Sequence, residues 1–204
     1  MDRPQWAFPF ASRAVLLRPG YRDAHDLLGN LFLQIADYSR SIDHYGKALA
    51  LSPNDPSSHY HLGFAQAVSG DFLKGKSSLL KSIEMEDQRL RTSDSAISKK
   101  SVEQTSSLTH ALTVRQASIA YLARLKLGEI AVAERQLETA AAEFSECLRL
   151  NPKAPLPYFE IGKIYYQIGD KSKAEDFFEK YLERGGSKEI IDKFKKSPDR
   201  DSHK

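Results

Sequence analysis

The segment GDFLKGKS, residues 70–77, has the residue types and spacing of a phosphate-binding loop, G-x-x-x-x-G-K-[ST]. In such a loop, backbone N–H groups and a lysine hold the phosphates of a nucleotide, and the last hydroxyl binds Mg²⁺. The loop must follow a buried β-strand and lead into a helix. Here SSHYHLGFAQAV precedes it with helical periodicity, and no apolar strand ending in a magnesium-binding Asp occurs elsewhere. A nucleotide-binding enzyme is therefore the less favoured hypothesis.

Histidines and one cysteine are the other candidates for chemistry. His25 and His59 lie 34 positions apart, with His44 and His61 nearby in the sequence. A metal site needs three or four converging ligands, and equivalent residues on stacked helices are about 10 Å apart, so we interpret these histidines as packing or surface residues. Cys147 is predicted to be a compact buried group. No nucleophile motif is present, so we predict no enzyme activity, no metal and no cofactor.

The composition is that of a soluble, folded chain. The 204 residues are 41% hydrophobic and 28% charged, and the formal charge of +3 is too balanced to indicate a nucleic-acid partner. A single cysteine excludes an internal disulfide and favours a cytoplasmic location. No apolar stretch reaches the length of a membrane span, and the N-terminal residues do not form a secretory signal.

An internal period of 34 residues organises the chain. Leu28-Gly29 recurs 34 positions later as Leu62-Gly63, and Leu127-Gly128 recurs at the same distance as Ile161-Gly162. Each of these segments is amphipathic, and a second amphipathic segment follows about a dozen residues later, so each unit contains two helices. The glycine, and a small residue early in the second helix, allow the two backbones to approach closely. That small-residue position holds Ser41, Gly75, Ala140 and Ala174, and Gly70 falls in the turn between the paired helices, so the repeat also accounts for the glycines of GDFLKGKS.

The pattern resembles the tetratricopeptide repeat over residues 22–89 and 121–188. The matching residues of the four units are Leu28, Gly29, Phe32, Tyr45, Ala48 and Pro53; Leu62, Gly63, Gly75 and Ser82; Leu127, Gly128, Ala140, Phe144, Cys147 and Pro152; and Tyr158, Ile161, Gly162, Tyr165, Ala174 and Phe178. The second unit is the weakest, with Gln66 where an aromatic residue is usual. The resemblance implies an all-α, right-handed superhelical solenoid of antiparallel helix hairpins that acts as a noncatalytic interaction scaffold.

The period also predicts the domain boundaries. We expect repeats at residues 22–55, 56–89, 121–154 and 155–188, and an insertion or degenerate repeat at 90–120 that consists of a loop at 92–100 and a helix. Residues 1–21 are predicted to be a partial repeat, or a cap in which Trp6, Phe8 and Phe10 cover the end. Residues 189–204 are predicted to form a capping helix, with Ile190, Ile191 and Phe194 packed inward, and a polar tail.

The residues that the repeat does not explain are candidates for partner binding. On the concave face of the first helices we predict a groove for a protein or peptide segment, formed by Asn30, Tyr60, Phe64, Leu125, Phe159, Lys163 and Tyr166. The alternative is that the aromatic residues pack against neighbouring units. Residues 88–126, with seven basic and two acidic side chains, are interpreted as a solvated segment, or alternatively as a dock for an acidic partner. A multiprotein complex is expected, and the chain is alternatively the adaptor part of a larger multidomain protein.

Overall fold

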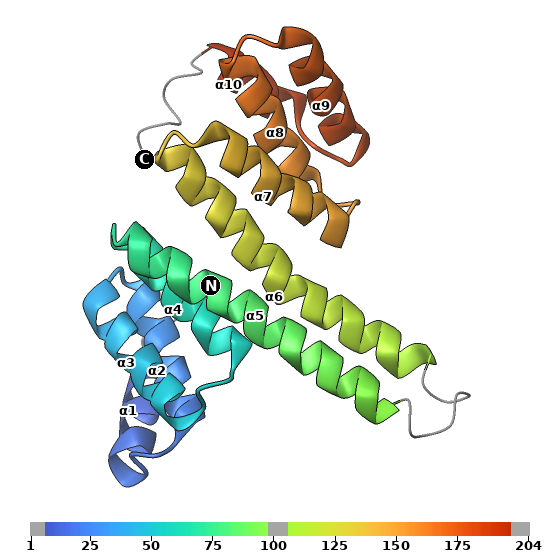
Figure 1. Cartoon of the computed structure of the whole chain (residues 1–204). Helices are drawn as coiled ribbons and strands as arrows, with labels where there is room; N and C mark the ends of the chain where they lie inside the picture. The colour runs from blue at the N-terminus through green and yellow to red at the C-terminus, as the bar shows by residue number, and fades with distance from the viewer. Residues whose placement is uncertain (1–6, 98–105, 197–204) are drawn as a thin grey trace. The chain divides into compact units, whose positions relative to one another are not determined.

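The computed structural model describes the backbone of residues 7–97 and 106–196, and the side chains of these residues outside 93–118. The described residues form ten α-helices and no strand (Figure 1), so the predicted all-α class is confirmed. They divide into two compact units, Met1–Ile119 and Ala120–Lys204, which we call the N-terminal and C-terminal units and describe separately. None of the helices in the described ranges is both long enough and apolar enough to cross a membrane.

Most of the helices pair as hairpins joined by short turns. In the N-terminal unit the helices are α1 (Ala7–Leu17), α2 (Arg22–Gln34), α3 (Tyr38–Leu51), α4 (Pro56–Val68) and α5 (Phe72–Ile97). The long α6 (Ser106–Ala133) ends in the C-terminal unit, which continues with α7 (Leu137–Leu150), α8 (Pro155–Gln167), α9 (Lys171–Glu183) and α10 (Lys188–Lys196). Helices α2 and α3, α4 and α5, and α8 and α9 pack closely on each other. Each pair corresponds to one predicted repeat, although α5 extends beyond the predicted boundary at residue 89.

The second helix of three pairs begins in the same way. The carboxylates of Asp37, Asp71 and Asp170 each accept a hydrogen bond from the backbone N–H three residues later, at 3.1–3.2 Å. Such an N-cap satisfies one of the amide groups that the first turn of a helix leaves unpaired. The residue before the cap has a positive φ, for example 92° at Gly70 and 88° at Gly169. The turn inside the hairpin is thus repeated along with the helices.

The glycines of the repeat lie where the two helices of a hairpin touch, as predicted. A Cβ atom added to Gly29, Gly128 or Gly162 would come within 2.5–2.7 Å of a ring atom of an aromatic residue 16 positions later. Those aromatic residues are Tyr45, Phe144 and Phe178, and all are buried. Any side chain larger than hydrogen on these glycines would push the paired helices apart.

The predicted loop at residues 92–100 is wrong where it can be compared, because α5 continues as a helix to Ile97. The polar side chains of TSDSAI do not end a helix by themselves, and neither glycine nor proline occurs between Lys76 and Ile97 to stop it. Residues 98–100 lie outside the described ranges. The helix expected after the loop, running toward the third repeat, is α6.

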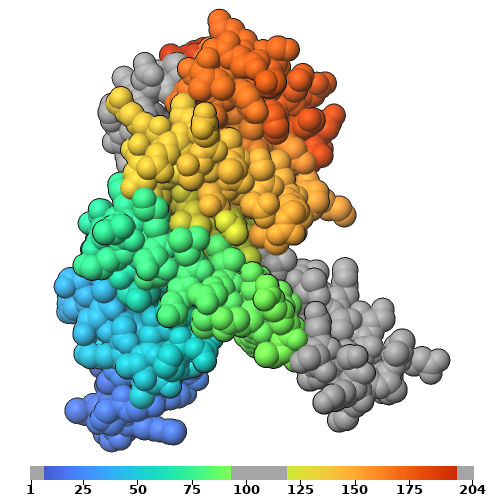
Figure 2. Space-filling model, viewed as in Figure 1, coloured from blue at the N-terminus to red at the C-terminus, as the bar shows by residue number. Residues whose placement is uncertain are grey.

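The predicted N-terminal cap is partly corrected. Helix α1 forms the outer end of the N-terminal unit (Figure 2), and Pro9 lies in its first turn, where its missing N–H is not needed. Phe8 packs edge-on against Phe32 of α2 with 5.1 Å between ring centroids. Phe10, by contrast, is 76% exposed, and Trp6 lies outside the described residues.

The predicted C-terminal capping helix is α10. Ile191 and Phe194 are each only 3% exposed, because they face the preceding hairpin. Ile190 was expected to pack inward with them, but it is 47% exposed, since its position falls on the outer side of the helix. The polar tail after residue 196 lies outside the described ranges.

Candidate functional site

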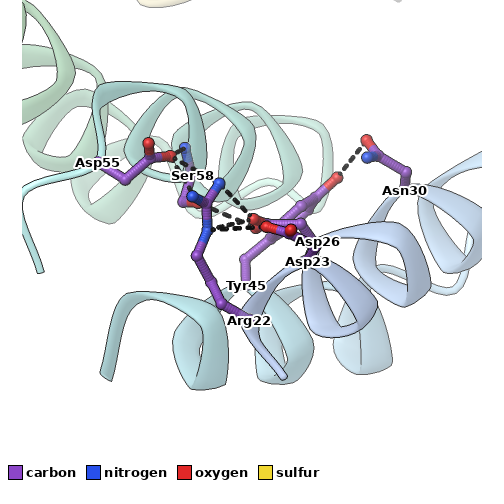
Figure 3. Close-up of polar contacts among 7 residues, drawn as sticks. All are labelled: Arg22, Asp23, Asp26, Asn30, Tyr45, Asp55 and Ser58. Atoms are coloured by element: carbon purple, nitrogen blue, oxygen red, sulfur yellow. Dashed lines mark hydrogen bonds and ion pairs between the residues drawn. The ribbon is translucent and has the colours of Figure 1, made fainter. Parts of the chain in front are cut away.

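A polar network joins the first helices of two successive predicted repeats, α2 and α4 (Figure 3). Arg22 donates to Asp26 at 2.8–2.9 Å and reaches Asp55 at 3.4 Å. The Ser58 hydroxyl lies 2.9 Å from a carboxylate oxygen of each aspartate, and Asp55 also accepts from the Ser58 backbone N–H at 2.8 Å. Partly buried ion pairs that share hydrogen bonds hold their partners in one geometry. The network therefore fixes the relative position of α2 and α4.

Asn30 is positioned by a buried tyrosine of the paired helix. The Tyr45 hydroxyl donates to Asn30 Oδ1 at 2.8 Å (Figure 3), and Tyr45 has no exposed surface. Burial raises the pKa of Tyr45 far above its ordinary value, so the hydroxyl keeps its proton and remains a donor. The carbonyl of the Asn30 amide is thus occupied, and the amide keeps its two N–H donors for other contacts.

Tyr60 and Phe64 lie one turn apart on α4, with 6.3 Å between their ring centroids. His61 connects them to α3, because its ring stacks on Tyr45 at 5.6 Å and meets the edge of Tyr60 at 5.2 Å. Burial lowers the pKa of His61, which favours the neutral imidazole. Tyr60 and Phe64 are both partly exposed. We call Asn30, Tyr60 and Phe64 the first-helix face of the N-terminal unit.

In the C-terminal unit, three of the predicted groove residues lie against α10. Phe194 of α10 contacts Phe159 and Tyr166 of α8, at centroid distances of 6.1 and 5.5 Å, and Lys163 Nζ lies 5.9 Å from its ring centroid. Phe159 is only 7% exposed. It is therefore a core residue in this structure and does not expose its ring in a groove, because Phe178 and Tyr181 of α9 and Phe194 of α10 all pack against it.

The remaining predicted groove residue, Leu125 on α6, is partly buried against the cluster formed by Ala131, Phe144 and Ile161. Tyr166 stays partly exposed, and Lys163 forms an ion pair with Glu160 at 3.0 Å. Of the basic segment, Lys99 and Lys100 lie outside the described residues, and Arg124 is paired with Glu143 at 2.9 Å. Binding by any of these residues stays a prediction.

The histidines one period apart share a structural contact. The Nε2 atoms of His25 and His59 lie 3.0 and 2.8 Å from the carbonyl oxygens of Pro19 and Pro53. Tyr158 makes the same contact in the fourth predicted repeat, with its hydroxyl 3.2 Å from the carbonyl of Pro152. In each case, a side chain on the first helix of a repeat contacts the carbonyl oxygen of a proline. That proline follows the preceding helix in the chain. These residues are used for packing, in agreement with the sequence-based interpretation.

His25 and His44 form a close pair between α2 and α3, with 3.1 Å between their Nδ1 atoms. A neutral histidine has one donor and one acceptor nitrogen, so the contact to the Pro19 carbonyl makes His25 Nδ1 the acceptor and His44 Nδ1 the donor. Burial lowers the pKa of His44, which favours this neutral arrangement. Within the described part of the chain, no group of three or more His, Cys, Asp or Glu residues is arranged to hold a metal ion.

The GDFLKGKS segment does not form a phosphate loop. It runs from the turn after α4 into α5, and a helix, not a strand, precedes it. Gly75 is buried where the hairpin crosses, and a Cβ there would lie 3.1 Å from the carbonyl oxygen of Gly63 and the amide nitrogen of Ala67. Gly75 is thus needed for packing of the two helices, and the nucleotide-binding hypothesis has no geometric support.

Cys147 is fully buried, with its Sγ 3.6 Å from the Tyr121 carbonyl oxygen. Burial raises the pKa of its thiol to about 12, so the reactive thiolate is disfavoured at neutral pH. This agrees with the predicted role of a compact apolar group.

Two family models match the chain. One, described as TPR repeat, matches residues 29–70, and the other, described as tetratricopeptide repeat, matches residues 114–189. The chain is a tetratricopeptide repeat protein. The first match begins within α2 and ends in the turn before α5, and the second begins within α6 and ends at the start of α10. No curated protein matches the sequence of this tetratricopeptide repeat protein.

Solved structures share the fold at low sequence identity. A crystal structure of MamA aligns with a TM-score of 0.67 and 17% identity, over 91% of this chain and 95% of MamA. PilF of Pseudomonas aeruginosa aligns with a TM-score of 0.69 and 18% identity, over 98% of this chain and 79% of PilF. PilW, a type IV pilus biogenesis factor, aligns with a TM-score of 0.62 and 16% identity, over 89% and 70% of the two chains. At these identities the similarity establishes the fold alone.

Proposed function

We propose that this tetratricopeptide repeat protein is a noncatalytic scaffold that binds a segment of a partner protein on the first-helix face of its N-terminal unit. One observation carries the proposal. The partly exposed Tyr60 and Phe64 are linked through His61 and Tyr45 to the amide of Asn30. Aromatic anchors beside a hydrogen-bonding amide are the combination that proteins use to hold a peptide.

The rigidity of the face supports this function. Arg22, Asp26, Asp55 and Ser58 bond α2 to α4, and Tyr45 fixes one side of Asn30. A surface that is already ordered before binding loses less conformational entropy when a partner docks. Tyr and Phe offer a large contact area with only two side-chain torsions to fix. A partner segment would place an apolar side chain against the rings and a backbone carbonyl near the amide donors of Asn30.

The C-terminal unit is proposed to take a lesser part. Leu125, Lys163 and Tyr166 keep partial exposure and are the residues of that unit that a bound segment could contact, whereas Phe159 is covered. A scaffold of this kind works within a multiprotein complex, and an adaptor role within a larger protein uses the same face. The predicted repeat boundaries at 22–55, 56–89, 121–154 and 155–188 remain part of this proposal.

The test compares two equivalent substitutions in the same unit. Phe64→Asp places a charge on the first-helix face, and Leu73→Asp makes a similar change at a residue of α5 that is 78% exposed. Proteins that co-purify with the wild-type chain are identified by mass spectrometry, after circular dichroism has shown equal helix content and melting temperature for all three proteins.

We expect one or more partners to be lost with Phe64→Asp and retained with Leu73→Asp. If both variants retain the same partners as the wild type, the first-helix face is not the binding surface. If both variants lose the same partners, the loss follows from adding an acidic charge to this unit, and the face again has no special role.

A further inference from the structure

The aromatic side chain of α10 occupies a pocket on the C-terminal unit. Phe194 is surrounded by Phe159 and Tyr166 of α8 and by Phe178 of α9, with ring centroids 5.5–6.2 Å away. Lys163 Nζ lies near the faces of both Phe159 and Phe194, at 5.4 and 5.9 Å from their centroids. We call Phe159, Lys163, Tyr166 and Phe178 the Phe194 pocket. Three of its four members are residues that the sequence analysis selected as partner-binding.

Few contacts hold α10 in this pocket. The helix has nine residues, and only Ile191 and Phe194 are buried. Lys195 adds an ion pair between its Nζ and the Glu175 carboxylate at 2.6 Å, where Glu175 is more than half exposed, and a contact with the face of Phe178 at 5.2 Å from the ring centroid. An exposed pair of this kind contributes little. A helix of nine residues is also not stable in water without its docking surface, so α10 unfolds when it leaves the pocket.

The connection between α9 and α10, and the space beside α10, would allow α10 to leave the Phe194 pocket. Gly185, with a φ of 86°, and Gly186 join α9 to α10. In the docked state their N–H groups donate to the carbonyls of Leu182 and Tyr181, and when these bonds open, two adjacent glycines allow the chain to take other directions. A cavity of about 270 Å³ remains between α9 and α10 and is lined in part by Phe178, Leu182 and Ile191. Thus α10 leaves some apolar surface of α9 uncovered.

We propose that the Phe194 pocket is an exchangeable binding site, in which α10 is replaced by an amphipathic, lysine-bearing helix of a partner protein. The inference rests on the proposed scaffold function and adds a second site to it, with the chemistry of its ligand. The chain shows that chemistry in α10 itself, where an aliphatic and an aromatic residue lie three positions apart.

The charges around the pocket favour a basic ligand. Glu175 and Glu179 line the cavity on the α9 side, and Glu175 takes Lys195 as its partner in the docked state. The cation of the pocket, Lys163, is already paired with Glu160 at 3.0 Å. A partner helix with a lysine next to its aromatic residue repeats this pairing, whereas an acidic helix would face the two glutamates. While α10 is docked, it blocks the pocket, and a partner must compete with a helix tethered beside it.

A peptide with the sequence of α10 tests the exchange directly. The probe is a fluorescently labelled peptide, SKEIIDKFKK, which copies residues 187–196, and its binding to the full chain is followed by fluorescence anisotropy. A tethered helix competes at an effective concentration of about 1 mM, so the wild type should bind the probe weakly. Phe194→Ala in the protein weakens the tethered competitor and should tighten probe binding about tenfold or more.

Two controls make the result specific. Lys193→Ala changes an exposed residue of the same helix and should bind the probe as weakly as the wild type does. A probe in which the phenylalanine is replaced by alanine should not bind the Phe194→Ala protein. Equal probe affinities for the three proteins, or binding that does not need the phenylalanine of the probe, would overturn the proposal.

A second measurement uses the wild-type chain alone, in case Phe194→Ala does not fold. Hydrogen exchange is measured with and without excess unlabelled peptide. We expect the amides of α10 to exchange faster when the peptide is present, while those of α2 and α3 do not change. Unchanged protection of α10 at high peptide concentration would refute exchange. Neither experiment involves Phe64, so failure here leaves the test of the first-helix face intact.

Discussion

Replacing Gly63 with alanine tests whether the hairpin α4–α5 is held by backbone contact. The added Cβ would lie 2.8 Å from Leu79 Cγ and 2.9 Å from both the Gly75 carbonyl oxygen and the Leu79 amide nitrogen. Leu79 is fully buried, so it has no space to move into, and the two backbone atoms yield only if α4 and α5 separate. Overpacking destabilises by about 1–3 kcal/mol, and contact with two buried backbone atoms places Gly63→Ala in the upper part of that range, at about 2–3 kcal/mol. The better helix propensity of alanine offsets about 1 kcal/mol of this cost. We expect a net loss of about 1–2 kcal/mol.

The matched control is Gly46→Ala, on α3 of the same unit. A Cβ at Gly46 meets no atom within 4 Å, so only the gain in helix propensity remains, and the chain should become more stable by about 0.5–1 kcal/mol. For a chain of this length, the two variants should then differ in melting temperature by roughly 5–10 °C, measured by far-ultraviolet circular dichroism. A Gly63→Ala variant that melts at or above the temperature of Gly46→Ala would refute the close-crossing argument.

Two predictions concern pH. The backbone N–H and the side chain of Lys173 lower the pKa of Asp170, so its carboxylate stabilises the fold above about pH 4, and this stabilisation is lost as the pH falls through the lower folded pKa. The melting temperature of Asp170→Asn should therefore drop less than that of the wild type between about pH 5 and pH 2, and parallel curves would exclude the cap as a source of acid sensitivity. Burial lowers the pKa of His44, so the unfolded chain binds the proton more tightly and stability falls as the pH drops below about 6.5. His44→Phe keeps a ring against Phe32, and its melting temperature should change less between about pH 7 and pH 5 than that of the wild type. An equal change in the two proteins would show that His44 is not the source of this pH dependence.

The hairpins could be predicted from the sequence because the spacing of small and bulky residues in the repeat indicates where two helices cross. A glycine followed 16 positions later by a bulky residue requires two helices to cross at that point, and Gly128 with Phe144 does so. At residues 92–97 the repeat pattern gives no such constraint, and the loop predicted there from polar composition is wrong. Polar residues can continue a helix when neither glycine nor proline interrupts it, so this composition does not mark a helix end.

The candidate site was harder to predict, because its key contacts join residues that the repeat pattern does not relate. Arg22 and Asp55 are 33 residues apart, and only the stacking of α2 on α4 brings them together. The signal that could have indicated one end of the network is Asp55-Pro56, a typical helix start. Phe159 was selected as an exposed anchor, because its position is not one of the packing positions of the repeat pattern. In the structure it packs against Phe178 and Tyr181 of its own repeat, and against Phe194 of a helix outside the repeats.

The bond from three of the first helices, α2, α4 and α8, to the preceding proline carbonyl has a consequence for how such a chain can change its length. Donor and acceptor are always six residues apart, whether the donor is His25, His59 or Tyr158. If residues 20–53 were deleted, His59 would follow Pro19 at that same distance, and the contact would form again across the new junction. Duplication of a 34-residue segment would likewise copy a complete donor and acceptor. Gain or loss of whole repeats therefore leaves every such junction intact, whereas an insertion of any other length between proline and donor breaks one.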